Sequence, residues 1–401
     1  MKKLYLNRAK TQIARSNTIR NINRQIVLNY VRDCSPISRA TIAKETTLNR
    51  STVSAIVETL HLDGFIEEIG MGSSSGGRKP TLLKLKTGKP VAIGIDITPR
   101  QTTIAVADMG GKIMEREDFP TIPIADEMSV KLVEKVSKFV NLFENDEMEI
   151  GITVPGVTDC LTGNVLSVPH FKWLNWNIRQ LLAKKTGLNV TIENDANAIA
   201  LAELWSGGAK IRGIKNFITV LISEGIGTGM IFDGQIYRGE KGLAGEFGHM
   251  IIGSDSPVFC SCGSRNCWEA FASDKAALAR YAQLIKTKND CPKCHSVNSI
   301  NDLIELGKQG DENALQVLKE TGKFLGIGIS SLIIGLSPQA VIVSGAITDA
   351  WDIISDELKT FVGRSVRIGL PQIYLTTSTL GNQPTLIGAI NLVLARKFAS
   401  A

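Results

Sequence analysis

The chain has 401 residues, of which 43% are hydrophobic and 21% are charged, as in ordinary globular proteins. No apolar run reaches transmembrane length, and the basic N-terminal stretch lacks the apolar core and cleavage site of a secretory signal, so we expect a cytoplasmic protein without a membrane partner. Seven cysteines are too few for a disulfide scaffold, and clustered cysteines in a reducing compartment more often bind metal.

Charge is divided unevenly along the chain. Residues 1–90 carry 16 Lys and Arg against 6 Asp and Glu, a net charge of +10. The remaining residues carry 29 basic and 33 acidic side chains, a net charge of −4. A basic head of this kind suits the phosphate backbone of nucleic acid, and the alternative is an ordinary solvated surface.

The basic head begins with a helical pattern. Residues 24–33 are typical of an amphipathic helix. A second helix is expected after Ser38, a residue type that caps helix N-termini, with Ile42 and Ala43 on its inner face.

A third helix is expected between the cap Asn49 and a stop at Gly64. Its apolar stripe consists of Val53, Ile56, Val57 and Leu60. The opposite face, near the N-terminal end, is small and polar, which suits insertion into the major groove of DNA. The DNA contacts expected from the helices of the head are Arg39, Arg50, Ser51, Thr52 and Ser54.

Two short strands are expected at 65–69 and 81–85, and they flank the glycine-rich basic segment GMGSSSGGRKP. This pattern predicts a winged helix-turn-helix, in which Arg78 and Lys79 lie at the tip of the wing and reach phosphates or a minor groove. The alternative is that the segment is a flexible linker.

From residue 91 strands and helices alternate, so the body is predicted to be α/β. Strands are expected on either side of a tight turn at 98–100 and again at 149–157. The other expected elements are a strand, polar turn and helix at 189–210, a hairpin with a glycine-rich bend at 217–239, and a strand at 340–347.

Five separated motifs occur together in the body. They are VPG at 154–156, ENDAN at 193–197, GEFGHM at 245–250, CSCGSRNCWE at 260–269 and SPQAVIVSGAI at 337–347. In this order and spacing they resemble the ROK family of sugar kinases and transcriptional repressors, and the resemblance covers essentially the whole chain, including the head.

The resemblance implies an α/β fold in which an N-terminal winged helix-turn-helix is followed by two actin-like, ribonuclease-H-like lobes with a ligand cleft between them. The expected domains are a DNA-binding domain at 1–88, a small lobe at 89–198 completed by the C-terminal helix 384–401, and a large lobe at 199–383 with a zinc motif.

One imidazole and three thiols lie close together in sequence, and their spacing resembles the zinc motif of the family. The expected ligands are His249, Cys260, Cys262 and Cys267, a closed tetrahedral set typical of structural Zn²⁺. The family usually has glycine just before the last cysteine, whereas this chain has Asn266, which tolerates the left-handed backbone conformation. The alternative is four unrelated buried residues.

In kinases of the family, residues of these motifs hold the hydroxyls of a sugar. The matching residues here are Asn194, Asp195, Glu246, His249 and Glu269. Carboxylates, an amide and an imidazole are able to hydrogen-bond such hydroxyls. His170 matches a loop position near the sugar, where it either tunes which sugar fits or is an ordinary surface histidine.

The two phosphate loops of the kinases are altered in this chain. Where the family has an Asp-x-Gly-Gly-Thr turn, residues 96–100 read DITPR, which lacks both glycines and gains a proline that has no N–H to donate. In the second loop, Glu224 replaces a threonine, and its negative charge opposes a triphosphate. Both changes argue against phosphoryl transfer, so no catalytic residue and no enzyme activity are expected.

The sequence thus predicts a sugar-responsive repressor that binds a double-stranded DNA operator as a homodimer or tetramer and releases it when a monosaccharide binds. Several segments resemble the xylose repressors of Gram-positive bacteria, which makes xylose the leading effector. A hexose, an N-acetylated sugar or a sugar phosphate stays open as the effector, as does activation instead of repression. The alternatives are a ROK sugar kinase with an appended head and a purely architectural DNA-binding protein.

A second cysteine pair, Cys291 and Cys294, precedes His295 in a polar stretch. The pair could bind a second metal or act as a redox pair, but no further cysteine pair lies nearby, and we favour an exposed loop.

Overall fold

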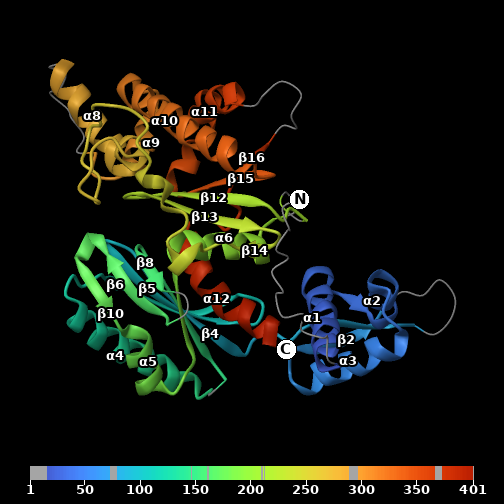
Figure 1. Ribbon diagram of the computed structural model, residues 1–401. Coiled ribbons are helices and arrows are strands. Elements are labelled where there is room, and N and C mark those ends of the chain that lie inside the picture. The colour runs from blue at the N-terminus through green and yellow to red at the C-terminus, as the bar shows by residue number, and fades with distance from the viewer. Residues whose placement is uncertain are drawn as a thin grey trace, which may run out of the picture. The chain divides into compact units, whose positions relative to one another are not determined.

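The computed structural model divides the chain into two compact units (Figure 1). The head unit comprises Met1–Val91, Ala107–Met114 and Leu394–Ala401, and the body unit comprises Ala92–Val106 and Glu115–Val393. The residues that the structure describes are 16–72, 79–145, 147–159, 162–208, 211, 213–288, 297–365 and 373–400. The domain boundaries expected from the sequence stay a prediction.

Three helices and a small antiparallel sheet form most of the head unit. The helices are α1 (Ser16–Cys34), α2 (Arg39–Thr46) and α3 (Arg50–Leu62), and the strands are β1 (Ile37–Ser38), β2 (Ile66–Met71) and β3 (Thr81–Leu85), paired in the order β1-β3-β2. The helices and the sheet share a core in which Val31, Ile42, Val57, Leu60 and Leu83 are fully buried. The two expected strands are present, and the two-residue strand β1 is too short for the sequence pattern to show.

The ends of the head helices follow local chemistry. Ser38 caps α2 as predicted, because its Oγ accepts a hydrogen bond from the Thr41 N–H at 3.1 Å. Asn49 occupies the N-cap position of α3 as predicted, although its side chain makes no capping hydrogen bond with any described residue. Gly64 has a φ of +77°, the left-handed conformation that stops a chain after a helix.

The first lobe of the body is built on a five-stranded sheet in the order β11-β7-β4-β5-β6. These strands are β4 (Pro90–Ile97), β5 (Gln101–Asp108), β6 (Ile113–Pro120), β7 (Glu149–Val154) and β11 (Val190–Asn194). Helices α4 (Ala125–Phe143) and α5 (Ile178–Thr186) pack on one face through buried Leu132, Val136 and Leu182. Strand β4 pairs with β7, and β7 with β11, in parallel, so their carboxyl ends lie at one edge.

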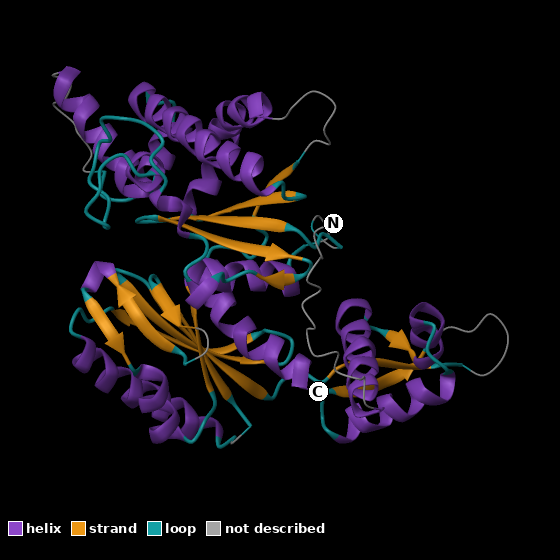
Figure 2. Ribbon diagram, viewed as in Figure 1, coloured by secondary structure: helices purple, strands orange, loops and turns teal. Residues whose placement is uncertain are grey.

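The C-terminal helix α12 (Pro384–Ser400) lies against the opposite face of this sheet (Figure 2). A Cβ atom on Gly151 would come within 2.0 Å of the Ala389 carbonyl oxygen, and one on Gly94 within 2.7 Å of Ile390. Glycine is required at both positions because the helix approaches the backbone of the strands directly.

The second lobe is built on a sheet in the order β14-β13-β12-β15-β16. Its strands are β12 (Phe217–Ile222), β13 (Ile226–Phe232), β14 (Gln235–Ile236), β15 (Ala340–Ser344) and β16 (Tyr374–Thr377). Its helices are α6 (Asp195–Ser206), α7 (Trp268–Ala272), α8 (Asp274–Lys288), α9 (Ile300–Lys308), α10 (Glu312–Leu336) and α11 (Trp351–Ser365). The predicted hairpin is present as β12 and β13, which pair antiparallel.

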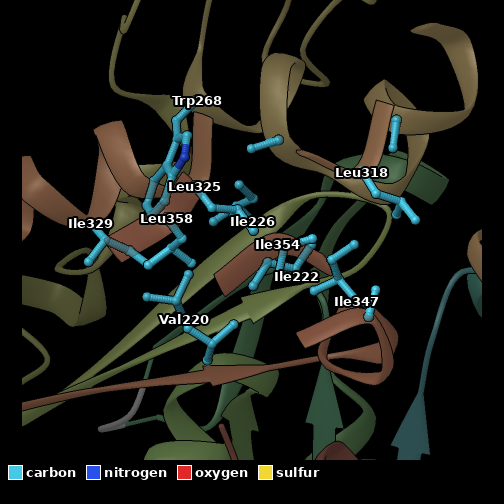
Figure 3. Packing of buried hydrophobic residues seen from close by; sticks show 14 of the residues in the cluster. Val220, Ile222, Ile226, Trp268, Leu318, Leu325, Ile329, Ile347, Ile354 and Leu358 are labelled. Carbon is cyan, nitrogen blue, oxygen red and sulfur yellow. The ribbon is translucent and has the colours of Figure 1, made fainter. Parts of the chain in front are cut away.

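Apolar side chains from the sheet and from α7, α10 and α11 form the largest core cluster (Figure 3). Val220, Trp268, Leu325, Ile329 and Leu358 are all fully buried in it. Each such side chain contributes roughly 1.5–3 kcal/mol by leaving water. The cluster therefore fixes Trp268, the first residue of α7, beside the motif that carries the cysteines.

The remaining elements are short. They are the strands β8 (Val157–Asp159), β9 (Asn164–Val168) and β10 (Trp173–Trp176), paired in the order β10-β9-β8, and the 3₁₀ helices η1 (Pro169–Phe171), η2 (Glu240–Gly242), η3 (Glu246–His249) and η4 (Ala346–Ala350). In the described part of the chain, no helix has the length and apolar character needed to cross a membrane. The predicted fold class, an α/β body behind an N-terminal helix-turn-helix, is confirmed.

Candidate functional site

A cleft of about 480 Å³ lies at the ends of strands from both sheets of the body. The residues that directly follow strands or end them there are Thr98 after β4, Pro155 after β7, Asn194 at the end of β11, Ser223 after β12 and Gly345 after β15. In open α/β sheets ligands bind in the crevice outside the carboxyl ends of the strands. All six sugar-binding residues predicted from the sequence line this cleft. His170 does so from the 3₁₀ helix η1.

Asn194 and Asp195 lie where β11 gives way to α6. The Asn194 side-chain oxygen accepts from the Asn197 N–H at 3.1 Å and so caps α6, while its amide nitrogen donates to the Gly156 carbonyl at 3.0 Å. The Asp195 carboxylate accepts from the Ala196 N–H at 2.8 Å. Both side chains are thereby held at the floor of the cleft by the start of a helix.

Burial raises the pKa of Asp195 to about 7, against the opposing effect of the Ala196 N–H. The nearby carboxylates of Asp96 and Glu246 add to this rise. Burial likewise raises the pKa of Asp96 to about 6, although hydroxyl donors from Thr385 and Thr153 oppose it. The cleft floor is therefore acidic, and burial brings the pKa of Asp195 close to neutral pH.

An ion pair that the sequence reasoning missed supports this floor. Glu193 is 3% exposed, and its Oε2 accepts hydrogen bonds from the guanidinium of Arg238, with both nitrogens at 2.8 Å. Its Oε1 accepts from the Asn194 backbone N–H at 3.1 Å and from the Asn197 side chain at 3.2 Å. No local signal marks Arg238, because its partner lies 45 residues away in sequence.

The four predicted metal ligands come together in the second lobe. The ligand atoms of His249, Cys260, Cys262 and Cys267 all lie within 4.8 Å of one another, so this cluster could hold a metal ion. The Nδ1 of His249 is 3.2 Å from the Cys260 sulfur. Asn266 has a φ of +69°, the left-handed conformation expected for the turn before Cys267.

The cluster adjoins the predicted sugar residues on two sides. The Nε2 of His249 is 3.5 Å from the Glu246 carboxylate, while its other ring nitrogen faces the thiols. The Glu269 Oε1 accepts from the backbone and hydroxyl of Ser261 at 3.2 and 3.1 Å and lies 2.9 Å from the Cys260 sulfur. His249 and Glu269 therefore belong to both the cysteine loop and the cleft.

His170 lies at the exposed rim of the cleft. Its ring contacts Phe171 edge-on at 4.8 Å, and Phe171 stacks on Trp173 at 4.7 Å. Trp173 is buried, and its indole N–H donates to the Pro123 carbonyl at 2.6 Å. An aromatic stack anchored in the first lobe therefore fixes where His170 stands.

At the other end of the cleft, the turn at 98–100 meets the turn at 223–225, the two segments predicted from the sequence to correspond to phosphate loops. Arg100 donates from Nε and from a terminal nitrogen to Glu224 Oε1, at 3.0 and 2.8 Å. Burial raises the pKa of Asp274 to about 7, the Glu224 carboxylate adds to the rise, and Arg100 opposes it. Asp274 lines the cleft and was also missed by the sequence reasoning, since nothing near it in sequence distinguishes it from a helix-starting aspartate.

The predicted DNA contacts of the head mostly lie on one exposed helix face. Arg50, Ser51 and Ser54 are exposed on α3, and Thr52 is half-buried. Lys79 is exposed, whereas Arg78 lies outside the described residues, as do Cys291, Cys294 and His295.

Arg39 has a partner within the head. Its guanidinium bonds the Glu68 carboxylate of β2 at 2.9 Å, and both side chains are substantially exposed. A phosphate that binds Arg39 would therefore compete with Glu68 for the same guanidinium.

A helix-turn-helix head followed by two α/β lobes with an acidic cleft and a His-Cys₃ cluster is typical of a class that includes sugar-responsive regulators and sugar kinases. The chain belongs to the ROK family, whose family model matches residues 92–396. It is 32% identical over 387 residues to the xylose repressor of Bacillus spizizenii, a match that covers 95% of this chain and 97% of that protein. It is 26% identical to the DNA-binding transcriptional dual regulator NagC of Escherichia coli, covering 96% of this chain and 95% of that protein.

Two solved structures show the same relationship. A ROK family transcriptional regulator, a homologue of the E. coli MLC protein, matches with a TM-score of 0.78 at 25% identity and covers 96% of this chain and 100% of that chain. A ROK family glucokinase from Streptomyces griseus, solved with glucose and AMPPNP, matches with a TM-score of 0.66 at 28% identity and covers 76% of this chain and 99% of that chain.

Proposed function

We propose that the chain is a sugar-responsive transcriptional repressor that releases its DNA operator when a monosaccharide binds in the body cleft. The observation that carries this proposal is the similarity to named repressors over 95% of the chain, head included. Xylose is the leading effector because the relative from Bacillus spizizenii and a second from Bacillus subtilis are xylose repressors that match over nearly their full length. Two-fold pairs of heads bind two half-sites at a fixed separation, so the protein is proposed to act as a dimer or tetramer.

The cleft has the chemistry that a neutral sugar requires. Asp195 and Glu246 present carboxyl oxygens, His249 presents its Nε2, and Asn194 presents its amide, and all four residues line one concave site. Sugar binding can shift the protein only as far as it favours one arrangement of the two lobes over another. Release of the operator is therefore proposed to follow from a sugar-bound lobe arrangement that suits DNA binding less well.

Phosphoryl transfer is the second candidate, and the glucokinase match favours it. The pairing of Arg100 with Glu224 argues against it, because the one arginine that could face a phosphate in these loops is already bound to a carboxylate. A triphosphate would have to break that pair and approach Glu224 and Asp274. We therefore propose that the cleft binds sugar without using ATP.

The His-Cys₃ cluster is proposed to hold a structural zinc ion. Zn–S bonds of about 2.3 Å in a tetrahedron place two sulfurs about 3.8 Å apart. The Cys262 and Cys267 sulfurs are 3.8 Å apart, which fits, whereas the Cys260 and Cys262 sulfurs are 3.1 Å apart and would have to separate when the ion binds. Bound zinc would keep the thiols ionised and cross-link the loop that carries Glu246 and Glu269.

Atomic emission of the purified protein tests this proposal. Wild-type protein is expected to contain one zinc ion per chain, and Cys262→Ser is expected to lose it. The control Cys34→Ser, which changes exposed Cys34 of the head, is expected to keep it.

A thermal-shift panel tests the proposed function. Purified full-length protein is heated with xylose, other pentoses, hexoses, N-acetyl sugars, sugar phosphates and Mg-ATP, since a ligand of the native state raises Tm by mass action. One sugar is expected to raise Tm by several degrees at about a hundredfold excess over its Kd, while ATP has no effect alone or with that sugar. Stabilisation by ATP, with consumption of ATP in the presence of sugar, would restore the kinase.

A further inference from the structure

An ion pair at the mouth of the cleft joins the two lobes, in addition to the pair of Arg238 with buried Glu193 at its floor. Arg100 lies in the turn between β4 and β5 of the first lobe, and Glu224 lies in the turn between β12 and β13 of the second lobe. The two side chains make two hydrogen bonds, at 2.8 and 3.0 Å, although they are 124 residues apart in sequence. Their exposed fractions are 65% and 32%, so the pair lies at the mouth of the cleft and not in its core.

The loop that carries Glu224 is packed directly behind a predicted sugar residue. The Ser223 N–H donates to the Gly225 carbonyl at 3.0 Å, which closes a tight turn, and the Asp274 N–H donates to the Ser223 carbonyl at 2.9 Å. A Cβ atom on Gly225 would lie 2.8 Å from Glu269 Oε2. Any displacement of this loop therefore changes the space available to the Glu269 carboxylate.

Charge at this end of the cleft depends on Arg100. The carboxyls of Glu224 and Asp274 interact with each other unfavourably, and the guanidinium of Arg100 interacts favourably with both. Removing Arg100 would leave two acids of the second lobe facing each other without a cation. Reversing its charge would in addition place an acid of the first lobe opposite them and push the Glu224 turn away from that lobe.

We propose that Arg100 and Glu224 form a clasp between the lobes, which positions the 223–227 loop behind Glu269 and so couples lobe closure to the affinity for sugar. The inference rests on the proposed sugar-binding function of the cleft. Arg100 and Glu224 act on the ligand through Glu269 and the lobe arrangement, and are positioning residues. Breaking the clasp lowers the population of the closed arrangement, and the apparent affinity falls by the same factor.

Charge reversal and charge exchange test the clasp in the full-length protein. The variants are Arg100→Glu, Glu224→Arg and the double exchange, and the control is Lys308→Glu, which breaks an exposed ion pair with Glu305 on α9. Two readouts are used: the Kd for xylose by calorimetry, and hydrogen exchange of the peptides that cover 96–101 and 221–228 in the ligand-free protein. The second readout needs no sugar.

Each single variant is expected to weaken xylose binding roughly fivefold, the most that a partly exposed pair usually supplies, and to speed exchange in both peptides. The double exchange restores both readouts, and the control changes neither. Unchanged exchange in the single variants, or a double exchange no better than either single variant, overturns the clasp. If the wild-type protein binds no sugar, the proposed function fails, and the exchange data still decide whether the clasp exists.

Discussion

At the scale of a single residue, the cleft determines the pKa of Asp195. Protein surrounds its carboxyl on the floor of the cleft, and two further acids face it, so its pKa rises to about 7. A carboxyl with such a pKa would suit proton transfer near neutral pH. The same carboxyl can equally hold a sugar hydroxyl, so its presence does not separate a kinase from a sensor. That distinction rests on Arg100 and Glu224 at the other end of the cleft.

The raised pKa of Asp195 predicts how stability depends on pH. The folded protein keeps the proton up to about pH 7, whereas the unfolded chain loses it near 3.8. The neutral carboxyl therefore contributes stability that is present below pH 4 and is lost as pH rises through 7. Asp195→Asn, which cannot ionise, should gain in Tm relative to wild type between pH 5 and pH 8.

Asp356→Asn serves as the matched control, because Asp356 is an exposed carboxylate on α11. Its Tm difference from wild type should stay level over the same range. If the Tm difference for Asp195→Asn also stays constant with pH, the cleft does not raise the pKa of Asp195.

At the scale of elements, two close packing contacts that require glycine hold the site together. Helix α12 lies on the backbone of β4 and β7, and helix α10 approaches the indole of Trp268 so closely that a Cβ atom on Gly328 would lie 2.0 Å from it. Trp268 also donates its indole N–H to the Phe324 carbonyl at 3.0 Å. Since Trp268 lies between Cys267 and Glu269, helix α10 determines the position of both the cysteine loop and the cleft.

Gly328→Ala should therefore destabilise the protein by about 1–3 kcal/mol, since overpacking forces the indole or the helix to move. The variant should also bind sugar more weakly, because Glu269 moves with Trp268. Gly335→Ala on the same helix is the control, as a Cβ there meets nothing within 4 Å. It should stabilise by roughly 0.5–1 kcal/mol through helix propensity. Urea unfolding measures both, and equal effects would contradict the packing argument.

At the scale of the whole molecule, the proposed DNA-binding and sugar-binding functions reside in different units. The exposed face of α3 belongs to the head unit, and the cleft residues belong to the body unit. Separate units allow one function to be lost while the other is kept, and that separation is itself testable.

Arg50→Ala should weaken operator binding by about 1–3 kcal/mol if Arg50 contacts a base, with the thermal shift caused by sugar unchanged. Fluorescence anisotropy with a duplex selected from a random pool measures the first quantity, at a stated salt concentration. Lys359→Ala, which removes an equal charge from the surface of α11, should leave DNA binding as it is. Equal losses in the two variants would indicate only a general charge effect.

The sequence by itself determined much of this protein, because its strongest signals are local. Apolar periodicity located α3 and its buried stripe, Ser38 marked the start of α2, and the spacing of His249 and the cysteines indicated a metal cluster. The winged tip at Arg78 lies outside the described residues and stays a prediction, and the sugar and DNA contacts stay proposals.

Only the tertiary structure decided which distant groups meet. Arg238 with Glu193, Arg100 with Glu224, and Asp96 with Thr385 each join segments 45 to 289 residues apart. Neither periodicity nor spacing in the sequence predicts such pairs. They form because the strand ends of two sheets, and the helices that follow them, meet at one cleft. The same convergence buries the carboxyls of Asp195 and Asp274 and raises their pKa, a property that depends on the surrounding protein and not on neighbours in sequence.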